Sequence, residues 1–435
     1  MADPQLALDL IRVVQDSLEA EATRRSTAGL PGLGDATQRE AFAVAVLKRE
    51  FLKLDERRLS EGAARLTLDD ESELTERALA EAVGLGPADL LLADETVEEI
   101  VATRHDLVFV MRSDGSRELV QDALWRSEKA LTDWVAHLAR TAGRTERQFN
   151  AQNPTLVMRI GEGLRLAATR DVSQHVSFAL RRNTISKGGG LGGLVGRGMM
   201  LPVVADLFRA CMRSDEMRIV IVGGTAAGKT TLARACLDEL EPMKRVVIIE
   251  DTAEIDLFDP ALHPDVESWE ERHANSEGEG AVSIGQLVKH ALRYRPDWLV
   301  CGEVRDSDAA VPMLKAMTHG QSSLTTVHAN SAVAGLDKLA LYLGTGEDRL
   351  PIDVAHHQLS QAIDFVVHVD RGVGGKRFVS EIVEVAGYDA GRSTTNTIYT
   401  ATDGDGHTMQ RLTQAHVARL AAVGFDANEL GGGWR

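Results

Sequence analysis

The chain has 435 residues, 44% of them hydrophobic, which is enough for about three domains with real cores. This excludes a short peptide, a fibre and a disordered tail. Asp and Glu number 65 against 48 Lys and Arg, so the formal charge is −17. An acidic chain repels nucleic acid and anionic lipid unless its arginines are concentrated locally. We therefore expect no bulk nucleic-acid binding.

The cysteines and the hydropathy pattern indicate where the chain works. Cys211, Cys236 and Cys301 are each isolated, so they form neither a disulfide framework nor a CxxC metal site. This favours a reducing cytoplasm. No window approaches the ~18 uninterrupted apolar residues that a membrane-crossing helix needs. We expect a soluble chain with no direct membrane insertion.

Residues 1–90 predict an N-terminal helical region. Apolar positions return every three or four residues in LALDLIRVVQDSL, REAFAVAVLKREFLKL and ELTERALAEAVGLG, and turns bearing Gly or Pro separate them. From 91 to 186 the pattern changes to short strand-like segments around one helical segment, 127–140, with a hairpin turn at Asp114-Gly115. This predicts a compact α+β domain.

The next segment, 187–200, is the densest in glycine and predicts an interdomain hinge. It formally contains G-x-G-x-x-G, but no strand runs directly into it, so a dinucleotide site is disfavoured. From 201 to 412 helical and apolar strand segments alternate, which predicts a mostly parallel sheet with helices on both faces. For 413–435 we expect a surface helix and a loose tail.

The strand-like run RIVIVGG leads into GGTAAGKTT (223–231) and then into the helical segment LARACLDEL. This is G-x-x-x-x-G-K-[ST] in its strand, loop and helix context, which predicts nucleoside-triphosphate binding. Gly223 and Gly228 permit backbone angles that turn N–H groups inward, Lys229 would bridge the β and γ phosphates, and Thr230 would ligate Mg²⁺. The predicted nucleotide-binding residues are Gly223, Gly224, Thr225, Ala226, Ala227, Gly228, Lys229, Thr230 and Thr231.

Three later strand-like segments also end in polar residues. Parallel strands bring such residues to the carboxyl edge of the sheet, where ligands bind in open α/β folds. The residues concerned are Glu250, Asp251, Glu254, Glu303, His328 and Asn330. Each acid alone could equally be a solvated loop residue, and His328 a core histidine. Because they converge on one phosphate loop, we predict a hydrolytic site with Glu303 near the Mg²⁺ waters.

Four motifs in fixed order resemble the secretion ATPase superfamily of type II and type IV secretion and pilus machines, most clearly its CpaF-like Tad/Flp branch. They are GGTAAGKTT, IEDTAEI, LRYRPDWLVCGEVRD and TTVHANS, and the likeness covers roughly 90–390. The resemblance implies a RecA-like P-loop ATPase domain behind a small PAS-like α+β domain, with ATP and Mg²⁺ as cofactors. Glu254 would then be the general base or orient the attacking water, Glu303 would support Mg²⁺, and His328 would sense the γ-phosphate.

The resemblance also implies a hexameric ring in which arginines of the N-terminal domain reach the phosphates. The matching segment, 153–182, offers Arg159, Arg165, Arg181 and Arg182, and Arg272 lies in a second family-like segment, 269–282. For each of these the alternative is a surface salt bridge. Such rings act on polytopic inner-membrane platform proteins, so we expect a cytoplasmic protein that is peripheral to the membrane through its partners.

Some features depart from the family pattern. Ala226 and Ala227 stand where Gly and Ser are usual, and the four-cysteine zinc module of many relatives is absent from the sequence. A nucleotide-gated scaffold with low turnover and a conjugative nucleic-acid export ATPase remain alternatives, and the cargo stays open. Two glycine-containing segments, 371–377 and 402–408, predict a hairpin loop and a turn, not ligand sites.

Overall fold

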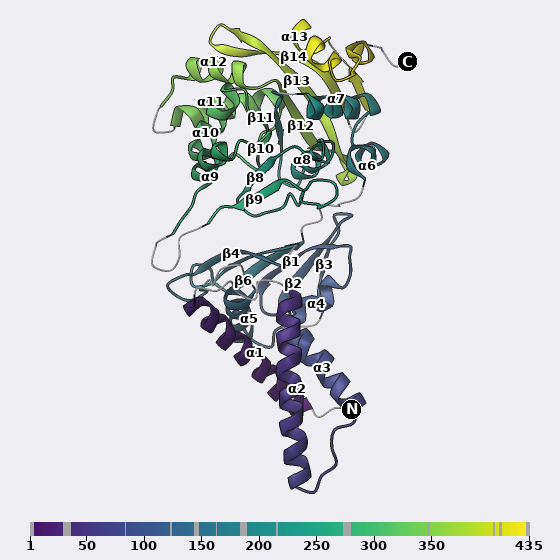
Figure 1. Ribbon diagram of the computed structural model, residues 1–435, viewed down its shortest axis with the longest axis vertical. Helices are drawn as coiled ribbons and strands as arrows, with labels where there is room; N and C mark the ends of the chain where they lie inside the picture. The colour runs from purple at the N-terminus through teal and green to yellow at the C-terminus, as the bar shows by residue number, and fades with distance from the viewer. Residues whose placement is uncertain are drawn as a thin grey trace. The chain divides into compact units, whose positions relative to one another are not determined.

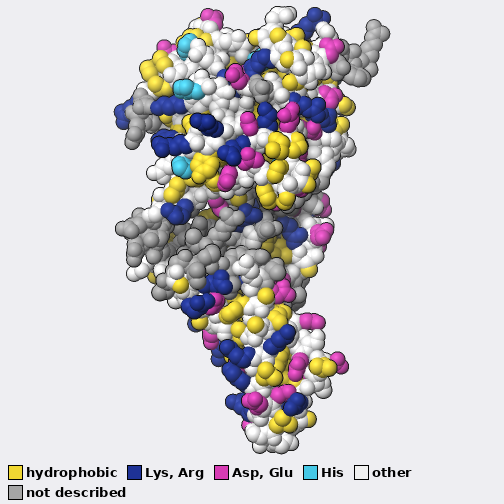
Figure 2. All heavy atoms as spheres, viewed as in Figure 1, with side chains coloured by type: hydrophobic (Ala, Val, Ile, Leu, Met, Phe, Trp, Pro, Cys, Tyr) yellow, Lys and Arg dark blue, Asp and Glu magenta, His cyan; other side chains and the backbone are white. Residues whose placement is uncertain are grey.

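The computed structural model divides into two compact units, Met1–Thr184 and Ile185–Arg435, which are described separately (Figure 1). The residues that the structure describes are 4–28, 36–82, 84–121, 124–142, 148–161, 163–182, 189–214, 216–272, 280–345, 349–402, 405–408 and 411–431. Figure 2 shows acidic and basic side chains interspersed on the visible face of both units, so the charge of −17 does not collect in one patch there.

The three helices predicted before residue 90 are present and pack on one another. Val14, Leu47 and Leu74, one from each helix, are almost fully buried in a shared core. The helices of the first unit are α1 (Pro4–Thr27), α2 (Ala36–Ser60), α3 (Leu68–Ala82), α4 (Pro87–Leu92) and α5 (Glu128–Thr141). The apolar spacing read from the sequence therefore identified the buried face of each of the first three helices.

The rest of the first unit is an antiparallel sheet in the order β3-β2-β1-β6-β5-β4. Its strands are β1 (Val97–Arg104), β2 (Leu107–Arg112), β3 (Arg117–Leu119), β4 (Thr155–Ile160), β5 (Leu164–Thr169) and β6 (Ser177–Arg182). Helix α5 shares a core with one face of it, where Ile100, Leu166 and Leu180 are buried. The expected strands and helix are confirmed, while the PAS-like likeness stays a prediction.

The second unit is built on a sheet in the order β15-β14-β13-β12-β7-β11-β10-β8-β9. The strands from β12 to β9 run parallel, and β13, β14 and β15 are added antiparallel. Their bounds are β7 (Arg218–Gly223), β8 (Val246–Glu250), β9 (Val266–Glu270), β10 (Trp298–Cys301), β11 (Ser322–Val327), β12 (Phe365–Arg371), β13 (Arg377–Asp389), β14 (Arg392–Thr402) and β15 (Asp405–Thr408). The phosphate-loop strand β7 thus lies in the interior of the sheet.

Helices cover both faces of this sheet, as predicted. One core contains side chains of α6, α7, α8 and α13, and the other contains side chains of α9, α10, α11 and α12. These helices are α6 (Gly190–Gly196), α7 (Pro202–Arg213), α8 (Lys229–Leu237), α9 (Ile284–Ala291), α10 (Ser307–Thr318), α11 (Ala332–Thr345), α12 (Ile352–Ala362) and α13 (Gln414–Ala421), with short 3-10 turns at Leu292–Tyr294, Val373–Gly375 and Ala427–Gly431. The α/β class is confirmed. Among the described helices, none combines the length and apolarity needed to cross a bilayer.

The segment predicted as a glycine-rich hinge differs from the expectation. Residues 190–196 form helix α6, and Leu191 and Leu194 are buried against the neighbouring helices. Gly189 enters the helix at φ 100°, a left-handed conformation that glycine adopts without steric cost. The high glycine content indicated a flexible segment. The two leucines, three positions apart, nevertheless give this short helix a buried face.

The C-terminal segment is also more buried than the sequence suggested. The segment predicted as a surface helix and a loose tail contributes Leu420, Phe425 and Leu430 to the core. Residues 432–435 lie outside the described part of the chain. The predicted turn at 402–408 forms part of the β14–β15 hairpin, with residues 403–404 not described, and the predicted hairpin loop at 371–377 joins β12 to β13.

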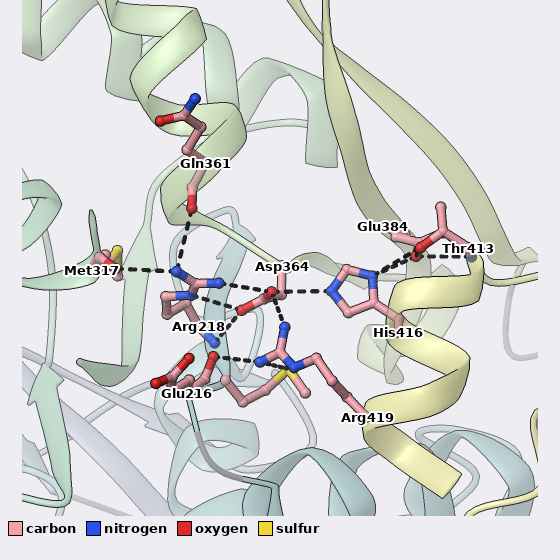
Figure 3. A network of polar contacts seen from close by, with 10 residues as sticks. Glu216, Arg218, Met317, Gln361, Asp364, Glu384, Thr413, His416 and Arg419 are labelled. Atoms are coloured by element: carbon pink, nitrogen blue, oxygen red, sulfur yellow. Dashed lines mark hydrogen bonds and ion pairs between the residues drawn. The ribbon is translucent and has the colours of Figure 1, made fainter. Parts of the chain in front are cut away.

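Buried ionic contacts hold α13 to the sheet (Figure 3). His416 donates from Nε2 to Asp364 (3.0 Å) and from Nδ1 to Glu384 (2.5 Å), and both carboxylates are buried. Arg419 of α13 and Arg218 of β7 also donate to Asp364. Burial disfavours a charged imidazole, but the hydrogen bonds to the two carboxylates raise the pKa of His416. Helix α13 is therefore attached through charged side chains that its sequence periodicity does not reveal.

Candidate nucleotide-binding site

The phosphate loop joins the end of β7 to the start of α8. A Cβ on Gly223 would lie 2.4 Å from the carbonyl oxygen of Val369, so only glycine fits there. Gly228, the residue before α8, has φ 99°, a left-handed value that again favours glycine. Steric constraints therefore require glycine at both positions of the motif. The N–H groups of the first turn of α8, which have no partner within the helix, come directly after Gly228 in the chain.

Lys229 is buried inside this loop. Its Nζ donates to the carbonyl oxygens of Gly223 (3.1 Å) and Gly224 (2.9 Å) and lies 3.3 Å from Nδ1 of His328. Burial lowers the pKa of Lys229, and the nearby carboxylates of Glu303 and Glu254 oppose that shift. The ammonium group is thus held by dipoles of its own loop, and a phosphate oxygen could replace them as its partner.

His328 follows β11 and connects the phosphate loop to the carboxylate of Glu303. Its Nδ1 accepts from Lys229, and its Nε2 lies 2.9 Å from Oε1 of Glu303. Burial and then the charge of Lys229 lower the pKa of His328. A neutral imidazole that accepts at Nδ1 carries its proton on Nε2, the nitrogen that faces Glu303.

Arg305 extends the same chain of contacts to Asp251, which follows β8. It donates from Nε to Oε2 of Glu303 (2.8 Å) and from Nη1 to Oδ2 of Asp251 (2.6 Å). The motifs that follow β7, β11, β10 and β8 are thereby linked side chain to side chain. The sequence analysis gave Arg305 no role, although its place two residues after Glu303 was a usable signal.

Glu250 and Glu254 have different surroundings. The buried carboxylate of Glu250 accepts the backbone N–H of Glu254 (3.0 Å) and of Ile255 (3.1 Å). A Cβ at position 302 would lie 2.7 Å from Cγ of Glu250, so glycine is favoured there. Glu250 therefore shapes the turn that carries Glu254, whose half-buried carboxylate is close enough to Lys229 to affect its pKa.

The residues present fit Mg²⁺. Thr230 supplies a hydroxyl at the start of α8, and Oε1 of Glu303 is buried yet accepts no well-formed hydrogen bond. A hydroxyl and a carboxylate are the oxygen ligands that Mg²⁺ prefers, and the ion keeps several waters of its own. Within the described residues, no group of three or more His, Cys, Asp or Glu could hold a metal by itself. Thr231 is partly buried one residue further along α8, and Asn330 is exposed after β11.

Three of the predicted arginines form a row across neighbouring strands of the first unit. Arg159 of β4 pairs in register with Arg165 of β5, which pairs with Arg181 of β6. They alternate with the residues buried against α5, so they lie on the other face of the sheet. Like charges directly opposite one another are unfavourable unless an anion or acid compensates them. Glu99, which pairs with Arg181, supplies one acid.

Two other predicted arginines are not part of this row. The guanidinium of Arg182 donates to the carbonyl of Leu92 in the first unit. Arg272, in the second unit, is exposed and donates from Nε to the carbonyl of Gly280. Neither contact belongs to the network that ends at Lys229.

Comparison with known proteins places these features in a family. The description "Type II/IV secretion system protein" matches residues 195–373. A putative conjugal transfer protein of Mycobacterium tuberculosis is 32% identical over 322 residues, which cover 69% of this chain and 84% of the relative. This chain belongs to the type II/IV secretion ATPase superfamily.

This chain is also similar to other proteins. A probable conjugal transfer protein TrbB of Sinorhizobium fredii is 30% identical over 73% of this chain and 91% of the relative. The X-ray structure of the ATPase DotB of Legionella pneumophila aligns with 68% of this chain and 81% of its own, at 18% identity and a TM-score of 0.48. The finer assignment to the CpaF-like branch stays a prediction.

Proposed function

We propose that this secretion ATPase superfamily member hydrolyses ATP and drives a ring motor that acts on a membrane machine. The observation that carries the proposal is the chain of contacts from Lys229 through His328, Glu303 and Arg305 to Asp251. It connects the phosphate loop with carboxylates from two other strands at one edge of the sheet. A nucleotide-binding scaffold needs the loop, but it has no need of acids arranged around it.

The chain's own residues give a sequence of events for hydrolysis. When ATP binds, the ammonium of Lys229 exchanges the carbonyls of Gly223 and Gly224 for phosphate oxygens, and loop N–H groups hold the β-phosphate. Thr230 and Glu303 would hold Mg²⁺, which when bound would supply positive charge to neutralise the phosphates. Glu254 orients the attacking water and accepts its proton. His328 contacts both Lys229 and Glu303, so it couples the exchange of partners at Lys229 to the position of Glu303.

The row Arg159, Arg165 and Arg181 supplies the positive charge that the transferring phosphoryl group needs. Guanidinium groups are suited to this because they stay charged and bind phosphate oxygens in a fixed geometry. Their register across three neighbouring strands brings three basic residues together on one face of the sheet, which makes one of them the candidate. This assignment requires one of these guanidinium groups to reach the phosphates, as the family resemblance implies.

The assembly that fits is a homo-oligomer, most simply a hexamer, at the cytoplasmic face of the membrane. Its partners are polytopic inner-membrane platform proteins of a Tad/Flp-type pilus or a type II/IV-like secretion system. Two of the relatives are described as conjugal transfer proteins, which supports conjugative export as the second candidate. Single-stranded DNA added to a steady-state ATPase assay separates the two, because only a translocase for nucleic acid is stimulated.

The motor is tested by Glu254→Gln, which keeps the size of the side chain and removes the base. We expect binding of an ATP analogue to be retained and steady-state turnover to fall by at least about 100-fold. Glu241→Gln, which changes an exposed acid before β8, is the control. Turnover retained in E254Q contradicts the role of Glu254, and a wild-type oligomer that binds ATP without turnover supports the scaffold instead.

A further inference from the structure

The hairpin between β12 and β13 lies against the phosphate loop. Strand β12 is the neighbour of β7, and Val369 pairs with Gly223 at the start of the loop. Arg377, the first residue of β13, donates from Nε to the carbonyl oxygen of Ala226 (3.1 Å). Its side chain also packs beside Gly228, where a Cβ would come within 3.3 Å of Cδ of Arg377. The segment interpreted above as a plain hairpin loop therefore contacts the middle of the loop.

Ala226 has an unusual backbone conformation. Its φ is 57°, in the left-handed region that residues other than glycine rarely adopt because Cβ approaches the following carbonyl. Such a conformation persists only where surrounding contacts hold it. The hydrogen bond from Arg377 is a contact of this kind, because a charged donor binds a carbonyl more strongly than a neutral one does.

The bond to Arg377 fixes the direction of one peptide group. In a trans peptide the C=O and the following N–H point to opposite sides. With the Ala226 carbonyl turned to Arg377, the N–H of Ala227 faces the inside of the loop, where it makes only a long bond (3.4 Å) to the carbonyl of Gly224. That donor is available to a phosphate oxygen. If the peptide turned over, a carbonyl dipole would face the anion instead.

We propose that Arg377 is a positioning residue of the phosphate loop: its guanidinium holds the Ala226–Ala227 peptide in the orientation that binds phosphate. This rests on the proposed nucleotide binding. Arg377 acts through the loop backbone, so its loss should raise KM for ATP and leave kcat nearly unchanged. Arg377 stabilises the strained backbone of Ala226. The effect of replacing Arg377 on ATP affinity should therefore depend on which residue stands at position 226.

The test is a double-mutant cycle in the full chain with Arg377→Gln and Ala226→Gly, measured by binding of a fluorescent ATP analogue. We expect R377Q to weaken binding of the analogue about tenfold relative to wild type. In the A226G background the same change should weaken binding less than about threefold, because glycine adopts φ 57° without strain. R377K, which keeps a donor, should lie closer to wild type than R377Q. Lys376→Gln is the control, since it removes a neighbouring charge from the same hairpin.

Amide hydrogen exchange of residues 223–231 in the nucleotide-free protein gives a second readout. R377Q should speed exchange in this loop, and K376Q should not. An equal loss of binding with and without A226G would mean that Arg377 contacts the nucleotide itself, and unchanged exchange would mean that it does not hold the loop. Either result overturns the proposal. If wild type binds no nucleotide, the proposed function fails, and the exchange measurement still decides the role of Arg377.

Discussion

Two polar networks lie at opposite edges of the large sheet, and each contains a histidine, with the pKa shifted in a different direction in each. At the carboxyl edge, His328 stands between the ammonium of Lys229 and Glu303, and its pKa is lowered. At the amino edge, His416 lies between the carboxylates of Asp364 and Glu384, and its pKa is raised (Figure 3). The pKa of a histidine therefore rises where two carboxylates accept its protons, and falls where burial and a neighbouring cation act together.

The two networks also differ in how completely they are satisfied. Asp364 accepts hydrogen bonds from Arg218, His416 and Arg419. Glu384 accepts hydrogen bonds from His416, Thr413 and Asn396. In the other network Glu303 keeps a buried oxygen without a well-formed hydrogen bond, and Lys229 is held by backbone carbonyls. A saturated network fixes a helix in place, whereas an unsaturated one leaves groups for a ligand.

The largest effect on stability should come from His416→Ala. Removing the cation leaves two buried carboxylates without a shared partner, so we expect the free energy of unfolding to fall by about 3–5 kcal/mol. Urea denaturation of the purified chain measures this. His328→Ala is the matched variant: its side chain is 39% exposed, so it should cost less than about 1 kcal/mol while lowering turnover. Equal losses of stability would remove the distinction between the two networks.

The two histidines should also respond to pH in opposite directions. The folded state binds the His416 proton more tightly than the unfolded state, so this contribution is complete below the ordinary pKa near 6.5 and is lost as pH rises through the folded pKa. For His328, with a lowered pKa, stability is lost as pH falls below about 6.5. Unfolding measured from pH 6 to 9 should show a decline that His416→Gln abolishes and His328→Gln leaves intact.

A smaller effect is expected from Arg305→Gln. This change releases Glu303 and Asp251 from their shared guanidinium without touching the loop, so turnover should fall about tenfold while affinity for the ATP analogue stays within about twofold of wild type. Arg293→Gln, a basic residue outside the network, is the control. If affinity falls and turnover per bound nucleotide does not, Arg305 belongs to the binding site and not to the orientation of the acids.

Much of the fold could be predicted because its signals are local. The helix around Val14, the strand before Gly223 and the hairpin at Gly115 are each determined by residues that are close together in the sequence. Helix α6 was missed because seven residues with four glycines carry little periodic signal. The buried contacts of helix α13 were missed because its partners are distant in the sequence: Asp364 directly precedes β12, and Glu384 lies on β13.

The sequence by itself determined the phosphate loop, the order of the four motifs and the types of side chain at the strand ends. Each depends on short spacing and on the chemistry that glycine, lysine and carboxylate bring to a phosphate. Only the tertiary structure decided which side chains touch. The strand order β12-β7-β11-β10-β8 places Arg377 on Ala226, His328 on Lys229 and Arg305 on Asp251. Those pairs, 54 to 151 residues apart, set the charges and backbone angles of the site, because electrostatic effects follow distance in space and not along the chain.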